Sequence, residues 1–344
     1  MENEIAQEVC GMIRGRRGCG KRIFCAFVFA AQIFGFSADA GTRKINVSIP
    51  TWGMPVIAFT MAKQKGYYRE EGLEVELVLM SAGVATRALI GGDVHFATTG
   101  GAGLPPILSG APLRFVFASF NRPMFWLCAK PEIREIKALK GKRVGVSNLG
   151  SGPDSLLLEI LKREGLEGGR DVLTLALGLQ GNIYAGLAGN FVDAAMLAPP
   201  FNFMAEEGGF RTLVSFIKED LVELQGGILL RESLLQSDAV LVERFIRATL
   251  RGLLHARALR PGTVAVLTRN LRVKETLAEK VYDAVRPAMV RDGTFTEEQQ
   301  RKALEHVLKR MDLAVSPPLE RIFNFSLTRK VGVALEAEGW KPKP

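Results

Sequence analysis

Strand-like and helix-like spacings of apolar residues follow one another along the first part of the chain. Residues 45–49 (INVSI) alternate apolar and polar side chains, as a strand does, and residues 73–80 (LEVELVLM) do so again. Between them, residues 56–72 have apolar positions at helical spacing, and Pro55 suits the first turn of such a helix. A second helical stretch closed by glycine leads to a third strand, VHFAT at residues 94–98. Short connections in this order predict a parallel sheet with helices on both faces.

The same succession restarts in the second half of the chain. Residues 142–216 repeat the plan of residues 45–120, with a strand at Arg143–Ser147 and a helix for which Ser151 is the predicted N-cap. The phrase ALIGGDVHFATT at residues 88–99 returns 98 positions later as GLAGNFVDAAML. Each phrase marks the joint between a helix, a glycine and the third strand of its copy. The pattern therefore predicts two copies of one α/β unit.

Two segments connect the copies, and a helical region follows them. Residues 115–133 are apolar and strand-like, and GGILL at residues 226–230 has the pattern of a strand that returns to the first copy. From Asp238 onward the apolar residues have mostly helical spacing, and Thr296 with Gln299 predicts a capping box. The simplest arrangement places the first copy and the C-terminal helices in one lobe.

The predicted fold is therefore α/β, with two lobes whose mostly parallel sheets are joined by two crossing segments. The predicted boundaries give a first lobe built from residues 41–127 and 227–344, and a second lobe at residues 128–226. With 344 residues, of which 47% are apolar and 24% charged, the chain is long and apolar enough for two such lobes.

The first 40 residues form a separate segment. A basic stretch precedes the apolar run Ile23–Phe36, and small residues stand before a predicted cut after Ala40. This order is typical of a secretory signal peptide, so we expect export to the periplasm, with Met12 as an alternative start. Removing the leader leaves Cys128 as the single cysteine and a net charge of +8, since five basic and four acidic residues leave with it. A lone cysteine excludes an intramolecular disulfide and a CxxC metal or redox site in the exported chain.

Two lobes joined by two crossings enclose a cleft, and the carboxyl ends of parallel strands point at its floor. Six loops follow the predicted strands there: PTWGMP (50–55), TTGG (98–101), SFN (119–121), SNLGSG (147–152), GLQGN (178–182) and APP (198–200). Hydroxyl groups and the N–H groups of helix starts hold anionic or carbonyl groups, and Trp52 offers a stacking surface. The absence of Asp and Glu from these loops argues against a cationic ligand.

Signatures of catalysis are sparse. HExxH, GxSxG, Walker-type and dinucleotide GxGxxG motifs in their proper contexts are missing from the sequence. We expect His95 to have a core or interlobe role, His255 and His306 to lie on the surface, and Cys128 to be a buried apolar side chain. The sequence therefore predicts no catalytic residue, metal or cofactor. It predicts no nucleic-acid partner either, because no run of basic residues is interleaved with aromatic ones.

Four phrases in order resemble the nitrate, sulfonate and taurine substrate-binding proteins, a group that includes binders of thiamine-pyrimidine precursors. They are GYYREEGLEVELV (66–78), ALIGGDVHFATTG (88–100), LKGKRVGVSNLGS (139–151) and LAGNFVDAAMLAPP (187–200). The resemblance implies a periplasmic-binding-protein-like fold that delivers a small organic ligand to the permease subunits of an ABC importer. It implies ligand contacts on the strand-end loops, which here means Trp52, Gly53, Thr98, Thr99, Gly100, Ser119, Ser151, Gly152, Gln180 and Pro199.

Two alternatives stay open beside the importer component. One is a pyrimidine-precursor-synthase-like enzyme on the same fold, although the related synthases use a cysteine-rich motif and histidines that bind iron, and the exported chain lacks such a cluster. The other is a periplasmic ligand-sensing protein, which only its partner would distinguish. The expected ligand is anionic or neutral: a sulfonate, taurine, nitrate, a pyrimidine-like compound or an aromatic acid. Arg87 and Arg122 stand near candidate loops, without an obvious oxyanion clamp. We expect a monomer.

Overall fold

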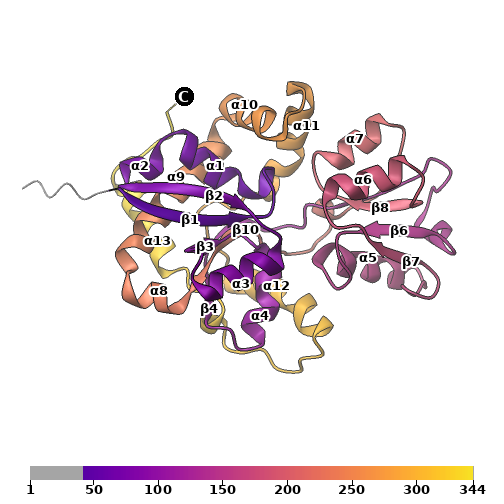
Figure 1. The fold of residues 1–344 in the computed structure, drawn as a ribbon, viewed down its shortest axis with the longest axis horizontal. Coiled ribbons are helices and arrows are strands. Elements are labelled where there is room, and N and C mark those ends of the chain that lie inside the picture. Colours follow the sequence, from indigo (N-terminus) through magenta and orange to yellow (C-terminus); the bar gives the residue numbers. More distant parts are fainter. Residues whose placement is uncertain (1–41, 344) are drawn as a thin grey trace, which may run out of the picture. The chain divides into compact units, whose positions relative to one another are not determined.

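Two five-stranded sheets organise the residues that the structure, a computed structural model, describes, namely 42–343 (Figure 1). The first sheet has the strand order β2-β1-β3-β10-β4. Its strands are β1 (Arg43–Ile49), β2 (Leu73–Leu79), β3 (Phe96–Ala97), β4 (Leu113–Phe120) and β10 (Gln225–Arg231). β1 runs parallel to β2 and β3, whereas β10 runs antiparallel to β3 and β4. The predicted leader, with its cut after Ala40, lies outside the described residues.

The second sheet repeats this plan in the order β7-β6-β8-β5-β9. Its strands are β5 (Trp126–Ala129), β6 (Arg143–Val146), β7 (Leu173–Ala176), β8 (Ala194–Leu197) and β9 (Arg211–Ser215). Here β5 is the antiparallel strand, paired with β8 and β9. Each sheet thus has one antiparallel strand among parallel ones, and that strand follows directly on a crossing from the other sheet. The predicted mostly parallel α/β sheets are confirmed, while the residue boundaries of the lobes stay a prediction.

The internal repeat of the sequence reappears in the register of the strands. Val47 of β1 pairs with Phe96 of β3 in the first sheet. Val144 of β6 pairs with Ala194 of β8 in the second sheet. The corresponding residues of the two pairs are 97 and 98 positions apart, within one position of the 98-residue spacing of the repeated phrase. The two copies therefore match in strand pairing as well as in sequence.

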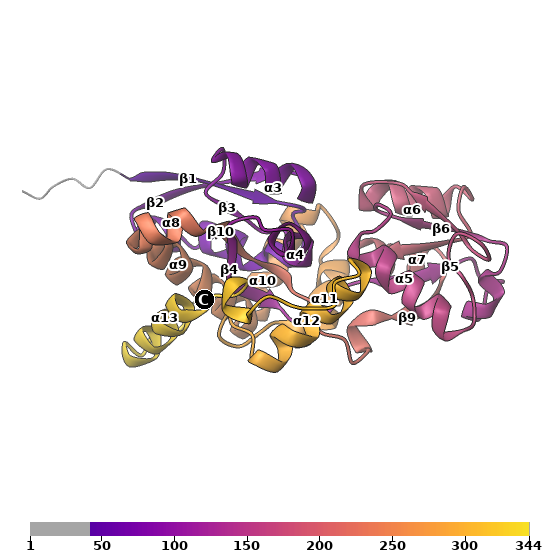
Figure 2. The same cartoon turned by 90° about the horizontal axis from the view of Figure 1, so that it is seen from below.

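Helices pack on the sheets, and Figure 2 shows α3 on one side of the first sheet and α13 on the other. The helices are α1 (Ile57–Gln64), α2 (Tyr67–Glu70), α3 (Ala82–Gly91), α4 (Leu104–Leu108), α5 (Gly152–Arg163), α6 (Gln180–Ala188), α7 (Phe201–Glu207), α8 (Glu232–Ser237), α9 (Ala239–Ala258), α10 (Arg260–Leu271), α11 (Glu275–Val285), α12 (Glu297–Arg310) and α13 (Ser326–Ala337). Within residues 42–343, none of these helices has the length and apolar character needed to cross a membrane.

Helix starts show how local sequence directs local structure. Thr296 and Gln299 form the predicted capping box of α12, with each side chain bonded to the other residue's backbone N–H. Ser151 occupies the N-cap position of α5, as predicted, and Pro153 lies in the first turn. The Ser151 hydroxyl, however, donates to the Asn148 carbonyl at 2.6 Å, so α5 begins without a side-chain cap.

One strand prediction needs correction. The third strand is shorter than the predicted 94–98, because only Phe96 and Ala97 keep ladder pairing. The predicted crossing segment at residues 115–133 contains parts of two strands, β4 and β5, which belong to different sheets. Its break falls at residues 121–125, where Pro123 lacks the backbone N–H that a continuous ladder requires.

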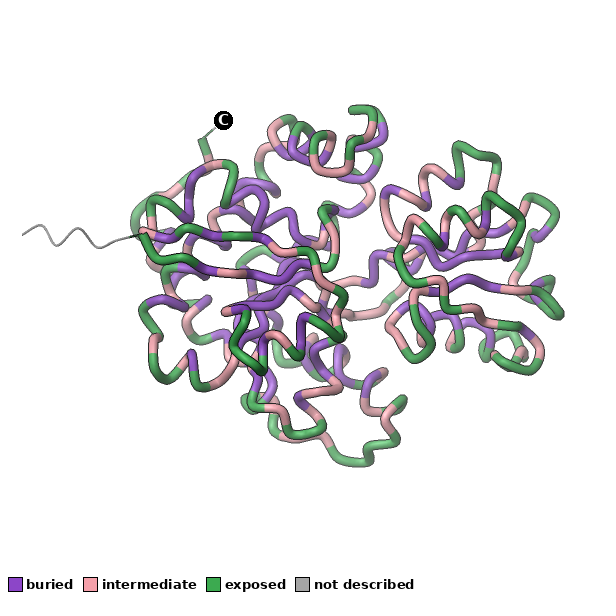
Figure 3. Tube along the Cα trace, viewed as in Figure 1, coloured by how far each residue is buried: buried purple, intermediate pink, exposed green. Residues whose placement is uncertain are grey.

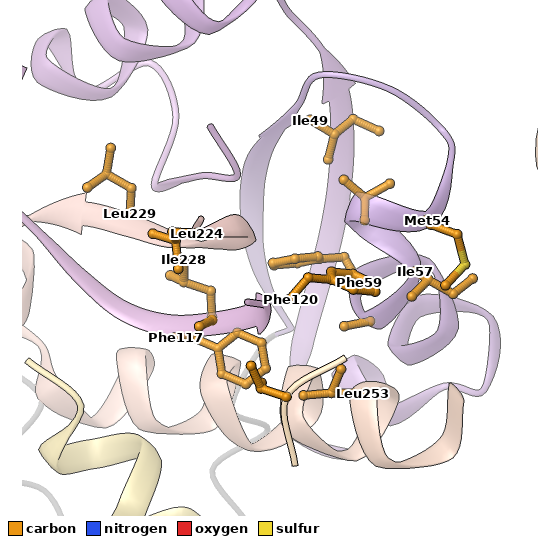
Figure 4. Packing of buried hydrophobic residues seen from close by; sticks show 14 of the residues in the cluster. Ile49, Met54, Ile57, Phe59, Phe117, Phe120, Leu224, Ile228, Leu229 and Leu253 are labelled. Atoms are coloured by element: carbon orange, nitrogen blue, oxygen red, sulfur yellow. The ribbon is translucent and has the colours of Figure 1, made fainter. Parts of the chain in front are cut away.

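The core lies against the strands, and β4, β5, β8 and β10 are mainly buried, as the purple tubes of Figure 3 show. The long helix α9 packs beside α1 and covers the first sheet, and its Phe245 ring stacks on Phe96 with the centroids 4.0 Å apart. Phe117 and Phe120 of β4 lie close to Leu253 of α9 in the same cluster (Figure 4). Residues distant in the sequence thus bury a large apolar cluster, and a second cluster lies against the second sheet. This burial is the main driving force for the fold.

The prediction that His255 lies on the surface is wrong. His255 is fully buried on the face of α9 that packs toward α2, and its Nδ1 lies 2.8 Å from the Tyr67 hydroxyl. Burial, aided by the positive charge of Lys65, lowers the pKa of His255 to about 4. The charged neighbours Arg251 and Arg257 suggest exposure in the sequence, yet helical spacing places His255 in line with the apolar residues of α9. His306 is half-exposed, closer to the prediction.

Candidate functional site

Loops at the carboxyl ends of strands from both sheets approach one another. Gly53 follows β1, and Pro199 follows β8. A Cβ placed on Gly53 would lie 3.8 Å from the Pro199 carbonyl oxygen, which is van der Waals distance. Trp52, the neighbour of Gly53, keeps 38% of its surface exposed. The first and last of the six predicted loops are therefore close together, with an aromatic face available beside them.

A second meeting point is built around Glu223, in the connection that leads from β9 back to β10. Its Oε1 lies 2.9 Å from the position of a Cβ on Gly152, at the start of α5. The same oxygen lies 3.7 Å from the position of a Cβ on Gly101, in the loop after β3. The Gly101 N–H donates to the carbonyl of Leu224 at 2.7 Å, which fixes this loop against the returning chain. The Glu223 carboxyl therefore lies between strand-end loops of the two sheets.

The electrostatic setting of Glu223 is unusual for a carboxyl group. Its Oε2 is buried and has no hydrogen-bond partner among the described residues. Burial raises the pKa of Glu223 to about 7, against the opposing effects of a hydrogen bond with Gln225 and the positive charge of Arg310. Near neutral pH the group can therefore accept a hydrogen bond as a carboxylate or donate one as a carboxylic acid.

Glu223 overturns one step of the sequence argument. The six predicted loops contain no acidic residue, and this absence argued against a cationic ligand. The acid comes from the connection before the return strand, a segment that the strand-end rule does not cover. The only sequence signal is its place in VELQGG, three positions before the first glycine of the pair Gly226–Gly227.

Three of the predicted site residues face the interior. Thr98 is 1% exposed, and its hydroxyl donates to the Ser48 carbonyl at 3.1 Å. Ser119 is fully buried, and its hydroxyl has no partner among the described residues. The Thr99 hydroxyl is also buried, 2.9 Å from the position of a Cβ on Gly103, on the side of the core. Thr98, Thr99 and Ser119 thus line the protein interior behind the loops.

Three other predicted residues shape the loops. Gly100 has a φ of 55°, and a Cβ there would lie 2.8 Å from the Leu224 carbonyl oxygen. Gln180 accepts a hydrogen bond from the Ala198 N–H through its Oε1 at 2.7 Å, which ties the start of α6 to the loop that carries Pro199. The Ser151 hydroxyl is within 3.2 Å of that of Ser147, at the other end of its own loop. These residues position backbone rather than presenting free side chains.

The two candidate arginines differ in their surroundings. Arg122 donates from Nη1 to the carbonyl of Glu219 at 2.9 Å and to that of Ile217 at 3.4 Å, so its guanidinium is tied to the connection before β10. It also lines a cavity of about 350 Å³ together with Asn121 and the start of α12. Arg87 is exposed on α3. Arg122 thus braces the crossing segments.

The two side chains considered for catalysis, Cys128 and His95, lie in surroundings that favour a structural role. Cys128 is buried, and burial raises the pKa of its thiol to about 12, which disfavours the nucleophilic thiolate. His95 is half-buried and its Nδ1 accepts the Asn46 N–H at 3.2 Å. Within residues 42–343, no group of three His, Cys, Asp or Glu side chains is arranged to hold a metal ion.

Comparisons with known proteins agree with the periplasmic-binding-protein-like fold. Residues 55–259 match the family model described as NMT1/THI5 like. No curated protein sequence matches the chain.

Three solved structures of similar fold illustrate the likeness. The periplasmic aliphatic sulphonate binding protein SsuA from Escherichia coli is 19% identical, with 80% of this chain and 94% of that chain covered and a TM-score of 0.63. The periplasmic nitrate-binding protein NrtA from Synechocystis PCC 6803 is 13% identical, with 86% and 90% covered and a TM-score of 0.69. A ligand binding component of an ABC-type import system from Staphylococcus aureus, with zinc bound, is 15% identical, with 84% and 99% covered and a TM-score of 0.68.

Proposed function

Because the chain belongs to the NMT1/THI5-like family, we propose that it is the periplasmic solute-binding component of an ABC importer. It captures a small organic molecule between the strand-end loops of its two sheets and delivers it to the permease subunits. The names of the similar structures support this role, since they describe a sulphonate-binding protein, a nitrate-binding protein and a ligand-binding component of an importer.

The observation that carries the proposal is the meeting of loops from both sheets. Gly53 faces Pro199, and Glu223 lies between Gly101 and Gly152. Ligands of open α/β sheets bind beyond the carboxyl ends of the strands. Two such sheets connected by two crossings hold a molecule between them by hinge closure. A binding role follows from this arrangement, and Trp52 supplies an apolar wall for part of the ligand.

The proposed location and partners follow from the same role. A component of this kind works outside the cytoplasmic membrane, which agrees with the signal peptide expected at residues 1–40 and a cut after Ala40. Its partners are the small molecule and the permease, and we expect the exported chain to be a monomer. The similar structures are mostly binding proteins, and we propose no catalytic step.

A thermal-shift screen of the exported chain at fixed ionic strength tests the proposal. The compounds are taurine, alkanesulfonates, nitrate, bicarbonate, aromatic acids, pyrimidines and flavins, with calorimetry on each hit. A ligand at about 100 times its dissociation constant stabilises the folded state by roughly 2.7 kcal/mol, which gives a clear rise in melting temperature.

The control separates binding from general damage to the fold. Trp52→Ala removes the exposed ring beside the loops, and we expect it to abolish the shift. Trp340→Ala removes an equally large ring that packs edge-on against Tyr67, with the centroids 5.7 Å apart, far along the chain from the loops. The shift should survive in this second variant. Absence of any hit, with metal or a turned-over product found instead, would favour the enzyme alternative.

A further inference from the structure

We propose that the Glu223 carboxyl determines the ligand class of this site, selecting a small molecule that donates an N–H hydrogen bond and rejecting a simple oxyanion. The inference rests on the proposed binding function and narrows it. Of the anionic and neutral ligands expected from the sequence, it excludes the simple oxyanions, because the fold brings an acid into the site.

The Glu223 carboxyl lies beside the start of α5. The N-terminus of α5 has no side-chain cap, and such a helix end attracts negative groups. Glu223 already brings its Oε1 to within 2.9 Å of the Cβ position of Gly152, the first residue of that helix. A negative group of this protein therefore stands where an oxyanion would otherwise be most stable.

A second acid, Asp154, also disfavours an oxyanion at the start of α5. Asp154, in the first turn of α5, is 4% exposed. Its Oδ2 accepts the Gly150 N–H at 2.7 Å, and its Oδ1 is buried without a partner among the described residues. A nitrate or sulfonate at the start of α5 would face both carboxyls. Like charges in a poorly solvated site repel strongly, and such repulsion is an effective way to exclude a wrong ligand.

Glu223 also has a hydrogen-bond acceptor that no described residue uses. Glu223 Oε2 is buried without a partner within the described part of the chain, and a buried acceptor in this state is costly. A ligand N–H that reaches Oε2 removes that cost. The charged group acting on Glu223 from the neighbouring helices is Arg310 of α12, whose Nη1 already donates to Ser155 Oγ at 2.8 Å. Arg310 therefore leaves the acceptor to the ligand.

The protonation state of Glu223 distinguishes a ligand that donates an N–H hydrogen bond from an oxyanion. Because the pKa of Glu223 is raised to about 7, part of the protein carries the neutral acid at neutral pH. A ligand N–H stabilises the carboxylate, so binding at pH 7 releases a proton from Glu223. An oxyanion would instead favour the neutral acid and take a proton up.

Matched pairs of compounds test the inference by calorimetry at pH 7.5. The pairs are taurine with ethanesulfonate and 4-aminopyrimidine with pyrimidine, and nitrate serves as the plain oxyanion. We expect the amino member of at least one pair to bind at least about tenfold more tightly than its partner, since hydrogen bonds to charged groups are the strong ones. Glu223→Gln should reduce this ratio to about threefold or less. Glu219→Gln, four positions earlier in the same connection, should leave the ratio unchanged.

The outcomes are distinct. If ethanesulfonate, pyrimidine or nitrate binds as tightly as the amino compounds, or if Glu223→Gln leaves the ratio unchanged, the inference is overturned while the proposed function stands. If no compound in the screen or in these pairs binds the wild-type protein, both are overturned together. Enthalpies of the bound amino compound measured at pH 7 in phosphate and in Tris add a further check. They should differ for the wild type and coincide for Glu223→Gln, and coincidence in the wild type would count against the inference.

Discussion

Burial moves the pKa values of Glu223 and His255 so that the neutral form of each side chain is favoured. It raises the pKa of Glu223 to about 7 and lowers the pKa of His255 to about 4. The Glu223 carboxyl lies between strand-end loops of the two sheets, whereas His255 of α9 forms a hydrogen bond with Tyr67 of α2. We expect the first residue to affect ligand binding and the second to affect the stability of the fold.

We predict that His255 makes the fold acid-sensitive. Its folded pKa lies below the unfolded value of 6.5, so its contribution to stability is full above pH 6.5 and is lost as the pH falls toward 4. His255→Asn keeps an acceptor for the Tyr67 hydroxyl without the titration. Urea unfolding at several pH values should show the wild type losing on the order of 1–3 kcal/mol more than this variant between pH 7 and pH 4.

His306→Asn is the matched control for the preceding prediction. His306 is half-exposed and lies 3.2 Å from Glu159. Because exposed ion pairs add little to stability, His306→Asn should lose nearly as much free energy of unfolding between pH 7 and pH 4 as the wild type does. Parallel stability profiles of the wild type and His255→Asn would contradict the assignment of this acid sensitivity to His255.

At the scale of elements, α5 and α12 have similar starts in the sequence and different ones in the structure. Both have a hydroxyl residue at the N-cap, Ser151 for α5 and Thr296 for α12. Only Thr296 accepts a bond from the first turn of its helix. The end of α5 that lacks a side-chain cap is the one beside which the Glu223 carboxyl lies.

This difference predicts unequal costs for two similar substitutions. Thr296→Ala removes a capping hydroxyl and should lower the free energy of unfolding by about 1 kcal/mol. Ser151→Ala removes a hydroxyl that bonds only within its own loop, so we expect a cost of roughly 0.5 kcal/mol or less. Urea unfolding of the ligand-free protein measures both. Equal costs would show that the Ser151 hydroxyl also stabilises its helix.

At the scale of the molecule, the C-terminal helices are bonded to helices of the second sheet. Lys280 of α11 lies 2.8 Å from Glu207 of α7, and His306 of α12 lies 3.2 Å from Glu159 of α5. The side chains of the first pair are more than half exposed. Exposed ion pairs add little to stability, so we expect these contacts to matter for opening more than for folding.

The double variant Glu159→Gln/Glu207→Gln tests this role. Its free energy of unfolding should fall by less than about 1 kcal/mol, while the dissociation rate of the compound found by the screen should rise up to about fivefold. Stopped-flow dissociation and urea unfolding measure the two effects. Glu243→Gln, which removes the exposed pair with Lys330 between α9 and α13, should leave the dissociation rate unchanged. A rate unaffected by the double variant would contradict the proposed contribution to opening.

Much of the fold could be predicted from the sequence because its signals are local. The alternation at residues 45–49 and 73–80, the joint before each third strand and the capping box at Thr296 all depend on neighbours a few positions away. Pro123 marks the break between β4 and β5, but no local signal shows that the two strands join different sheets.

The candidate site depended less on local signals. The sequence by itself determined the two α/β copies and the loops that end their strands, because hydrophobic period and turn residues act within each element. Only the tertiary structure decided that Thr98 and Ser119 face inward, that His255 is buried, and that Glu223 stands between Gly101 and Gly152. Those outcomes depend on contacts between residues far apart in the chain, whose burial and charge no local pattern encodes.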